Sequence, residues 1–152
     1  MALAALLRTC APSVGPVTMS ALVVFESGAR PYAIRDNATR RSYLPKTQSA
    51  ALRLATKLLR ERHAIDLGYA QINSNNFHAY GLTVESALQP CTNLRTGSRI
   101  LQADYARERH TYGAGQTALV HALSLYNTGD PWSGTGYAAG VYATAARLAG
   151  TP

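Results

Sequence analysis

Residues 16–31 read PVTMSALVVFESGARP, and this stretch decides the fold that we expect around it. Pro16 suits the first turn of a helix, where its missing N–H donor is not needed. Gly28 can adopt the left-handed conformation that ends many helices, and Pro31 then prevents the helix from continuing. The stretch therefore predicts a helix from Pro16 to just before Gly28, with Glu26 in its last turn.

Glu26 differs from the other carboxylates because the apolar residues 23–25 (VVF) come directly before it and the small Ser27 and Gly28 follow it. Burial disfavours the charged form of a carboxyl group, and so does the negative end of a helix. Both effects raise the pKa of Glu26, as a general acid that works near neutral pH requires. Glu26 is therefore a candidate catalytic acid, and a carboxylate that caps a nearby loop is the alternative. The residues alone leave that choice open.

The rest of the chain reads as helices joined by short polar loops. Apolar spacing predicts further helices over residues 3–9, 47–62, 84–88, 90–109, 117–126 and 137–148. A small hairpin or irregular loop is expected over residues 32–46, and an irregular segment over residues 66–76. The sequence predicts a mainly α (α+β) fold with a minor β element, as one domain over residues 1–152.

Composition agrees with a domain that has one core, since 47% of the residues are hydrophobic and 15% are charged. Arg8 and the prolines after it interrupt the apolar start of the chain, so no run approaches the roughly 20 apolar residues of a membrane span. Residues 1–7 also lack the basic start and cleavage site of a secretory signal. We expect no membrane span, and an export signal is not evident in this chain.

The net charge of +7 comes from thirteen Arg and two Lys, which are spread from Arg8 to Arg147. This pattern predicts a diffuse basic surface, which either keeps the protein soluble or attracts polyanions in general. The aromatic residues, mostly Tyr, do not interleave with the basic ones as they do where nucleic-acid bases stack. No specific nucleic-acid partner is therefore expected.

Other kinds of site find little support in the sequence. The four histidines lack metal-ligand spacing, and no GxSxG elbow or phosphate-binding loop is present, so we expect no metal and no cofactor. Cys10 and Cys91 would be buried thiols in a cytosolic protein and a pair in an exported one. The residues alone leave that choice open.

The other acidic side chains have ordinary explanations. Four lie on expected helices beside basic or polar residues, where a solvated charge is usual: Glu61, Glu85, Asp104 and Glu108. Three adjoin turn-forming residues and are expected to cap the backbone: Asp36, Asp66 and Asp130.

Four ordered blocks resemble the soluble lytic transglycosylase domain in its VirB1-like branch, which accompanies type IV secretion and conjugation machines. The first joins Cys10-Ala11-Pro12 to Glu26-Ser27-Gly28 and Pro31-Tyr32-Ala33-Ile34. Residues 66–73 (DLGYAQIN) resemble the family's Gly-Leu-Met-Gln-Ile block. Residues 90–95 (PCTNLR) with Gly97, and Leu125-Tyr126-Asn127, resemble two later blocks.

The resemblance implies a goose-lysozyme-like fold with a saccharide groove, in a protein of the periplasm or cell envelope. The implied activity is cleavage of the bond between N-acetylmuramic acid and N-acetylglucosamine in peptidoglycan, with Glu26 as the single acid and base and a 1,6-anhydro product. The implied substrate-binding residues are Ser27, Gln71, Asn73, Tyr126, Asn127 and Tyr137. Among these, Tyr126 is expected to place its hydroxyl near Glu26.

Two further expectations follow from the resemblance. In an oxidising periplasm, Cys10 and Cys91 are expected to form a disulfide. Ala70 stands where the family usually has Met, so we expect a contact at the groove wall to be lost, with Tyr69 filling the space. The alternatives are a hydrolytic muramidase, a non-catalytic wall-binding component of a secretion machine and a polyanion-binding module.

Overall fold

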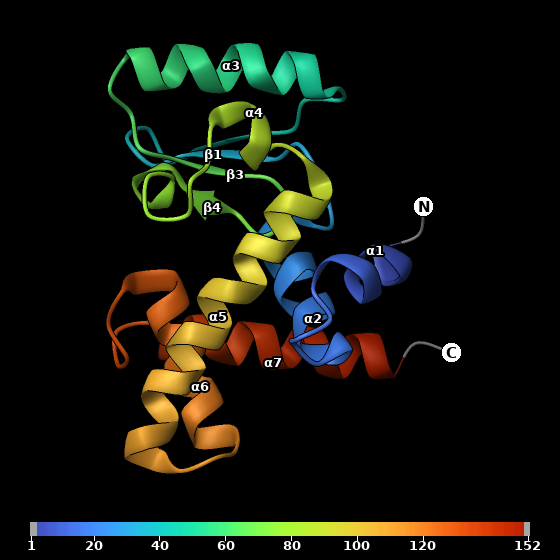
Figure 1. Ribbon diagram of the computed structural model, residues 1–152, viewed down its shortest axis with the longest axis vertical. Helices are drawn as coiled ribbons and strands as arrows, with labels where there is room; N and C mark the ends of the chain where they lie inside the picture. Colours follow the sequence, from blue (N-terminus) through green and yellow to red (C-terminus); the bar gives the residue numbers. More distant parts are fainter. Residues whose placement is uncertain (1–2, 151–152) are drawn as a thin grey trace.

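The computed structural model describes residues 3–150, most of which lie in helices (Figure 1). In chain order the elements are α1 (Leu3–Cys10), α2 (Pro16–Ser27), β1 (Ile34–Asp36), β2 (Arg41–Tyr43), α3 (Gln48–Arg60), β3 (Ile65–Leu67), β4 (Ile72–Asn73), the 3-10 turn η1 (Ser74–Asn76), α4 (Val84–Ala87), α5 (Pro90–Tyr112), α6 (Gln116–Thr128) and α7 (Thr135–Ala149). The predicted mainly helical fold with a small β element is confirmed.

Helix α2 begins and ends where the sequence predicts. Pro16 occupies its first turn, and Gly28 adopts a left-handed conformation with φ 61°. The N–H of Gly28 donates to the carbonyl of Val24 at 2.9 Å, which closes the helix end. Met19 and Leu22 are fully buried on this helix, so α2 runs through the core and carries Glu26 at its C-terminal end.

The sheet is antiparallel, with strand order β2-β1-β3-β4. The hairpin expected over residues 32–46 is its β1–β2 pair. The prediction of an irregular segment over residues 66–76 is wrong in part, because it contains the end of β3, all of β4 and η1. Strands of two and three residues are too short to show the alternation by which a strand is recognised. In the pairing of β3, Asp66 lies opposite Arg35 on one side and Asn73 on the other.

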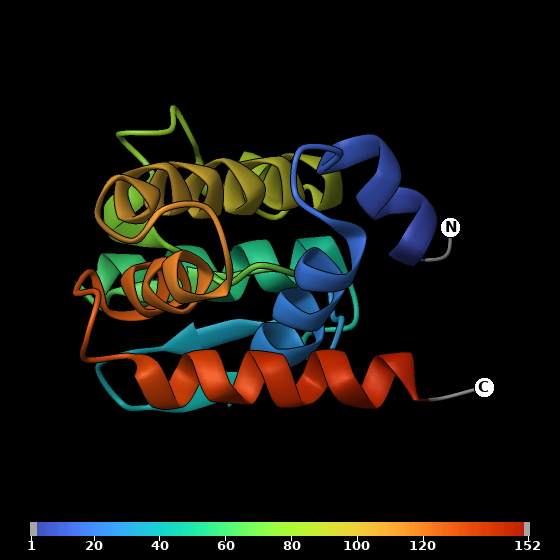
Figure 2. The ribbon, with the colours of Figure 1, turned by 90° about the horizontal axis from the view of Figure 1, so that it is seen from below.

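Two regions result, and the long helix α5 joins them. The sheet region holds β1–β4, α3 and α4, with α3 lying over the sheet (Figure 1). The helical region holds α1, α2, α6 and α7, and α6 lies between α5 and α7 (Figure 2). The predicted disulfide is confirmed: Cys10 at the end of α1 is bonded to Cys91 at the start of α5. The two cysteines are 81 residues apart in sequence. Closing a loop of this length lowers the entropy of the unfolded state, which stabilises the fold by roughly 4 to 5 kcal/mol at most.

Asn93 fastens α5 to the sheet region. Its side chain is buried, and Nδ2 donates to the carbonyls of Leu67 at 2.7 Å and Ala87 at 2.8 Å. Its Oδ1 accepts from the N–H of Ala70 at 2.8 Å. Gly68 permits this approach, because an added Cβ would lie 2.4 Å from Nδ2 of Asn93. These hydrogen bonds fix the loop between β3 and β4 at one position along α5. The side chains of this loop therefore have a defined position.

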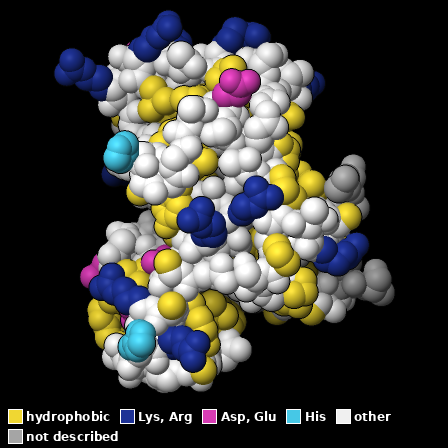
Figure 3. Space-filling model, in the orientation of Figure 1, with side chains coloured by type: hydrophobic (Ala, Val, Ile, Leu, Met, Phe, Trp, Pro, Cys, Tyr) yellow, Lys and Arg dark blue, Asp and Glu magenta, His cyan; other side chains and the backbone are white. Residues whose placement is uncertain are grey.

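The basic charge is less diffuse than predicted. Residues 30–62 hold nine of the fifteen basic residues and two of the eight acidic ones, so the whole net charge of +7 lies in this segment. Lys and Arg side chains gather over α3 at the top of Figure 3. The remaining six basic and six acidic residues cancel, and the helical region is close to neutral.

Candidate active site

A pocket of about 740 Å³ lies between the sheet region and the helical region, and we call it the central pocket. The surface is indented between the two regions on the left of Figure 3. The residues that line it come from both regions: Glu26, Asn37, Ala64, Asp66, Gln71, Ile72, Asn73, Asn75, Asn76, Tyr80, Ile100, Asp104, Leu125, Tyr126, Asn127 and Gly129. Three of them are acidic and none is basic.

Glu26 reaches the central pocket from the last turn of α2 and is half-buried. Burial raises the pKa of this carboxyl to about 7, a hydrogen bond from Tyr137 lowers it, and the negative charge of Asp66 raises it. The expected upward shift is confirmed. A group with this pKa is about half protonated at neutral pH, so it can both give and take a proton there.

Tyr137 holds the Glu26 carboxyl from α7. Its hydroxyl donates to Oε1 of Glu26, while its ring packs edge-on against Phe25 with the ring centroids 5.2 Å apart. Gly140 makes this packing possible, because an added Cβ would lie 2.5 Å from the Phe25 ring. Burial first, and the Glu26 charge second, raise the pKa of Tyr137, which therefore remains a neutral donor.

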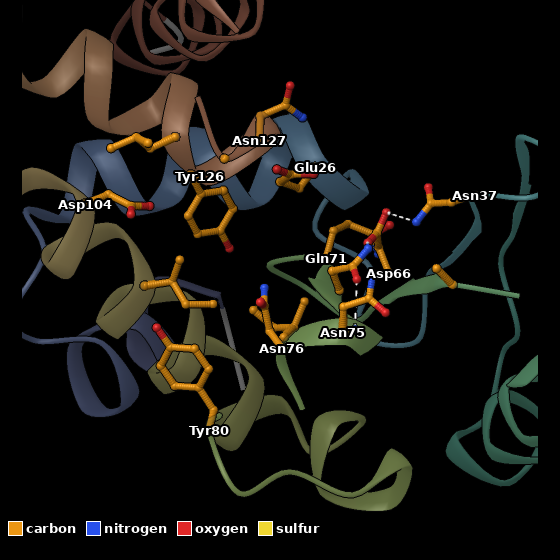
Figure 4. Close-up of a pocket in the computed structure, with 16 residues that line it drawn as sticks. Glu26, Asn37, Asp66, Gln71, Asn75, Asn76, Tyr80, Asp104, Tyr126 and Asn127 are labelled. Carbon is orange, nitrogen blue, oxygen red and sulfur yellow. Dashed lines mark hydrogen bonds between the residues drawn. The ribbon is translucent and has the colours of Figure 1, made fainter. Parts of the chain in front are cut away.

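Tyr126 lies beside Glu26 but bonds elsewhere. Its hydroxyl donates to the carbonyl of Ala70 at 2.7 Å, so the tyrosine that donates to Glu26 is Tyr137. Burial raises the pKa of Tyr126 well above its usual value, and the nearby carboxylates, Glu26 foremost, add to the effect. Figure 4 shows its ring on α6 between Glu26 and Asp104. The side chain forms part of the pocket wall and ties that wall to the β3–β4 loop.

Ala70, where the family usually has Met, packs against α5. Ala70 is fully buried and does not line the central pocket. It faces Gly97 of α5, where an added Cβ would lie 2.5 Å from the Ala70 Cβ. The small side chains of Ala70 and Gly97 therefore allow α5 to approach the loop closely. Tyr69 is also buried.

Gln71 lines the central pocket in a strained backbone conformation. Its φ of 47° lies in the left-handed region, which few side chains other than Asn and Asp adopt readily. Its Nε2 donates to the carbonyls of Gly68 at 2.9 Å and Ala33 at 3.2 Å. These two bonds fix the amide, and its Oε1 remains to accept a hydrogen bond from a ligand.

Ser27 supports the end of α2. Its side chain is buried, and its hydroxyl lies 3.0 Å from the carbonyl of Val23 and 2.9 Å from that of Tyr69. The same oxygen accepts from the N–H of Arg30 at 3.3 Å. These backbone contacts fix the helix turn that carries Glu26. Asn127, by contrast, is exposed at the margin of the central pocket.

A cluster around Asp66 was missed by the sequence reasoning. Asp66 was expected to cap the backbone, but its Oδ1 accepts from Nδ2 of Asn73 at 2.7 Å and its Oδ2 from Nδ2 of Asn37 at 3.0 Å. Figure 4 shows Asp66 and Asn37 joined in this way, on the side of the central pocket opposite Tyr126. Burial raises the pKa of Asp66, while the two amides and Arg35 lower it.

Asp104 was also expected to be solvated and instead lines the central pocket from α5. Burial raises its pKa to about 6, with Arg107 lowering and Glu108 raising it. Within residues 3–150, Oδ2 of Asp104 is the buried side-chain oxygen that lacks a hydrogen-bond partner. Such an atom is suited to contact a ligand. Glu108 is another exception to the predicted solvation, because its side chain is buried.

Two of the expected backbone caps are confirmed. Oδ1 of Asp36 accepts from the N–H of Ala38 at 3.0 Å, and Oδ1 of Asp130 accepts from that of Ser133 at 2.8 Å. Neither carboxylate lines the central pocket.

The predicted site residues thus fall into two groups. Five of them line the central pocket: Glu26, Gln71, Asn73, Tyr126 and Asn127. Tyr137 does not line the pocket but donates a hydrogen bond to Glu26, and Ser27 holds the helix turn that carries Glu26. The pocket combines a carboxyl with a pKa near neutrality, neutral tyrosines, and amides that can bind hydroxyl or acetamido groups. This arrangement can transfer a proton to and from a polar, uncharged ligand.

No helix within residues 3–150 is both long and apolar enough to cross a membrane.

The sequence of this chain is similar to a known protein family and to individual relatives. The family model of the transglycosylase SLT domain matches residues 5–134. Protein virB1 of Agrobacterium fabrum (strain C58) is 42% identical over 123 residues, which cover 81% of this chain and 50% of that protein. The type IV secretion system protein virB1 of Brucella abortus is 40% identical over 126 residues, covering 82% of this chain and 53% of that protein.

The chain spans about half the length of these curated relatives. No solved structure gives a significant match to it. The residues matched by the family model include every residue that lines the central pocket, whereas Tyr137 lies just beyond them. The match covers most of the chain and two relatives are at least 40% identical to it, so the chain belongs to the transglycosylase SLT domain family.

Proposed function

We propose that the chain is a peptidoglycan lytic transglycosylase, which cleaves the β-1,4 bond between N-acetylmuramic acid and N-acetylglucosamine and forms 1,6-anhydro-N-acetylmuramic acid. The observation that carries the proposal is the state of Glu26. Its carboxyl lies in the central pocket, has a pKa raised to about 7 by burial, and accepts a hydrogen bond from Tyr137. A glycosidic oxygen needs such an acid, because it leaves only as it gains a proton.

Cleavage begins when protonated Glu26 gives its proton to the oxygen that joins the two sugars. The bond between C1 of N-acetylmuramic acid and this oxygen breaks, and its electron pair stays on the oxygen of the departing sugar. Positive charge develops on C1 and the ring oxygen, and the acetamido group of the same sugar can share it. Tyr137 keeps the carboxylate of Glu26 in place at this stage, since it donates to the ionised form.

The second step returns the proton to Glu26. The 6-hydroxyl oxygen of the same sugar bonds to C1, and its proton passes to the Glu26 carboxylate. The chain is again in its starting state, and no water is consumed. One residue with a pKa near neutrality serves both steps, because neither the proton donation nor the return is strongly uphill.

The polar residues of the central pocket would hold the glycan. Gln71 offers Oε1 to an acetamido N–H, because its Nε2 is bound to two backbone carbonyls. Asn73 and Asn127 line the same pocket, and Tyr126 forms part of its wall. In this proposal Tyr137 and Ser27 act through Glu26, by holding its carboxyl and its helix turn.

We place this activity at the bacterial cell envelope, in the periplasm, with peptidoglycan strands as the substrate. Two matched relatives carry virB1 names, and one is described as a type IV secretion system protein. In our proposal the chain acts as one lysozyme-like domain over residues 1–152. It would open the wall locally for a secretion or conjugation machine, whose components would be its partners.

Specific features disfavour two of the alternatives. A wall-binding scaffold has no use for a half-buried acid with a pKa near neutrality, because keeping a carboxyl in such a site destabilises the fold when it ionises. A polyanion would be repelled by a pocket with three acidic residues and no basic one. The hydrolytic muramidase remains the competitor, since water can replace the 6-hydroxyl at C1.

The mass of the products decides between the two enzymes. Purified sacculi are digested with the protein, and the released muropeptides are analysed by mass spectrometry. We expect anhydromuropeptides, which are lighter by one water than the products of hydrolysis. Products that carry the extra water would make the protein a muramidase, and the absence of release at every pH from 4 to 8 would overturn the proposal.

A further inference from the structure

A second carboxylate is held in the central pocket on the wall opposite Tyr126. Asp66 lies in the middle of β3, where pairing with Arg35 and Asn73 on its two sides fixes its backbone. Its oxygens accept from Asn73 at 2.7 Å and from Asn37 at 3.0 Å. Asn73 is itself fixed, because its Oδ1 accepts from the N–H of Asn75 at 2.9 Å. The carboxylate therefore has a defined direction.

The fold gives Asp66 no evident structural duty. Within residues 3–150 it caps no helix and forms no close ion pair, and two asparagines, Asn37 and Asn73, donate to its oxygens. Burial works against its charge, whereas two N–H donors favour the charged form. A charge kept on a pocket wall by neutral amides is an arrangement suited to act on a ligand.

We propose that Asp66 is a second catalytic residue, an ionised carboxylate that stabilises the positive charge which develops on N-acetylmuramic acid while Glu26 exchanges its proton. This inference rests on the proposed function. In the first step the bond from C1 to the leaving oxygen breaks and the sugar becomes cationic. The cation then lies between two anions, Asp66 and the newly ionised Glu26, in a pocket where charges are poorly screened.

The hydrogen bonds of Asp66 favour this electrostatic role over proton transfer. Each of its two oxygens already accepts from an amide, and such bonds make a carboxylate a weaker base. In this proposal the proton remains with Glu26, and Asp66 acts through its charge. Its remaining lone pairs can accept from the acetamido N–H of the sugar, which gains positive charge as that group shares the charge of C1.

Asp66 also acts on Glu26 directly. The groups that face Glu26 are Tyr137 from α7, Tyr126 from α6 and Asp66 from β3. Among these, Tyr137 stabilises the ionised form of Glu26, and the Asp66 charge stabilises the protonated one. On its other side, Asp66 faces Asn37, Asn73 and Arg35, all of which favour its charged form. Burial is the main cause of the raised pKa of Glu26, and the Asp66 charge adds to it. In this proposal the same carboxylate also balances the sugar charge during cleavage.

The test is Asp66→Asn in the full chain, assayed for kcat and KM over pH 4 to 9 on purified sacculi. We expect kcat to fall about 100- to 1000-fold, as when one preorganised electrostatic partner of a transition state is removed. We expect KM to change little. The loss of activity at high pH, which reports ionisation of Glu26, should move to lower pH, because one of the effects that raise the pKa of Glu26 is gone while its burial remains.

Asp104→Asn is the matched control, since it removes another pocket carboxylate that is not among the groups acting on the pKa of Glu26. It should leave the high-pH limb where it is. The inference is overturned if Asp66→Asn keeps the kcat of the wild type. It is also overturned if the high-pH limb shifts equally in Asp66→Asn and Asp104→Asn.

If Asp66→Asn has a lower melting temperature than the wild type, a second variant tests the role of Asp66. Asn37→Ala removes one donor from the Asp66 carboxylate at an exposed turn. It should raise the pKa of Asp66 and so move the low-pH limb of activity to higher pH. An unchanged low-pH limb overturns the inference. A wild-type protein that releases hydrolysed products would refute the anhydro product alone, because the sugar cation precedes both outcomes.

Discussion

The two walls of the central pocket differ in composition and in their effect on Glu26. The helical wall brings Glu26 and Tyr137 against the apolar packing of α2 and α7. The sheet wall brings Asp66 with its ring of asparagines. Tyr137 lowers the pKa of Glu26, and Asp66 raises it. In the proposed mechanism, proton transfer would therefore depend mainly on the helical region, and recognition and charge balance on the sheet region.

The strongest test of this division is Glu26→Gln. Gln keeps the shape of a protonated Glu but can neither give a proton nor take one. Proton transfer by a positioned side chain contributes about 100- to 10,000-fold, and both steps here use one residue, so we expect a loss at the upper end of that range. Anhydromuropeptide release measures it. Glycan binding, measured by pulldown on sacculi, should persist because the sheet wall is intact.

The pH dependence of stability is the control for this variant. The folded pKa of Glu26, about 7, exceeds its unfolded value near 4.5, so the folded state holds a proton that the unfolded state has lost. Wild-type stability should therefore fall as pH rises from about 4.5 to about 7, and the Gln variant should lack this part of the fall. Undiminished release by the variant would remove Glu26 from the mechanism. Loss of release together with folding would make Glu26 structural.

A smaller effect is expected for Tyr137→Phe on the helical wall. Phe keeps the ring that packs on Phe25 but removes the hydroxyl that donates to Glu26. Because this hydrogen bond lowers the pKa of Glu26, its loss should move the high-pH limb of activity to higher pH. This direction is opposite to that expected for Asp66→Asn. We expect kcat to fall about tenfold, since a hydrogen bond to a charged group contributes about 1.5 kcal/mol or more.

Tyr142→Phe provides a matched control on the same helix. Tyr142 donates to Oε1 of Gln116 on α6 and has no bond to Glu26. Its variant should leave the high-pH limb unchanged. If both tyrosine variants moved the limb equally, a general change in α7, rather than the bond to Glu26, would be the cause.

The helical wall was predictable from the sequence to a greater extent than the sheet wall. The position of Glu26 follows from local signals, because Pro16 starts its helix and Gly28 ends it within a dozen residues. Asp66 gives no such signal. It becomes part of the site only when β3 pairs with β1 and brings Asn37, distant in sequence, to its side. Such pairing is decided by contacts between segments, which no periodicity records.

Contacts between distant segments also decide which of two tyrosines donates to Glu26. The family block points to Tyr126, but the hydroxyl that reaches Glu26 comes from Tyr137, beyond the residues that the family model matches. Its placement depends on Gly140 allowing α7 to lie close to Phe25. A glycine inside a helix signals close packing of some kind. It does not reveal that this packing brings the hydroxyl of Tyr137 to Glu26.

The smallest effect is expected on the sheet wall, for Gln71→Ala. The variant removes the acetamido contact that we propose for Oε1 and the two bonds from Nε2 to the backbone. Losing one neutral hydrogen bond of about 1 kcal/mol should raise KM about fivefold, with kcat changed less because Glu26 and its partners are untouched. The backbone strain at φ 47° is similar for Ala and Gln, so the melting temperature should fall only through the lost backbone bonds. Gln89→Ala is the control, since this exposed residue lies outside the central pocket and its side chain caps nothing. A fall in kcat with unchanged KM would mean that Gln71 acts on the chemical step. The proposed division of roles between the helical wall and the sheet wall would then be wrong.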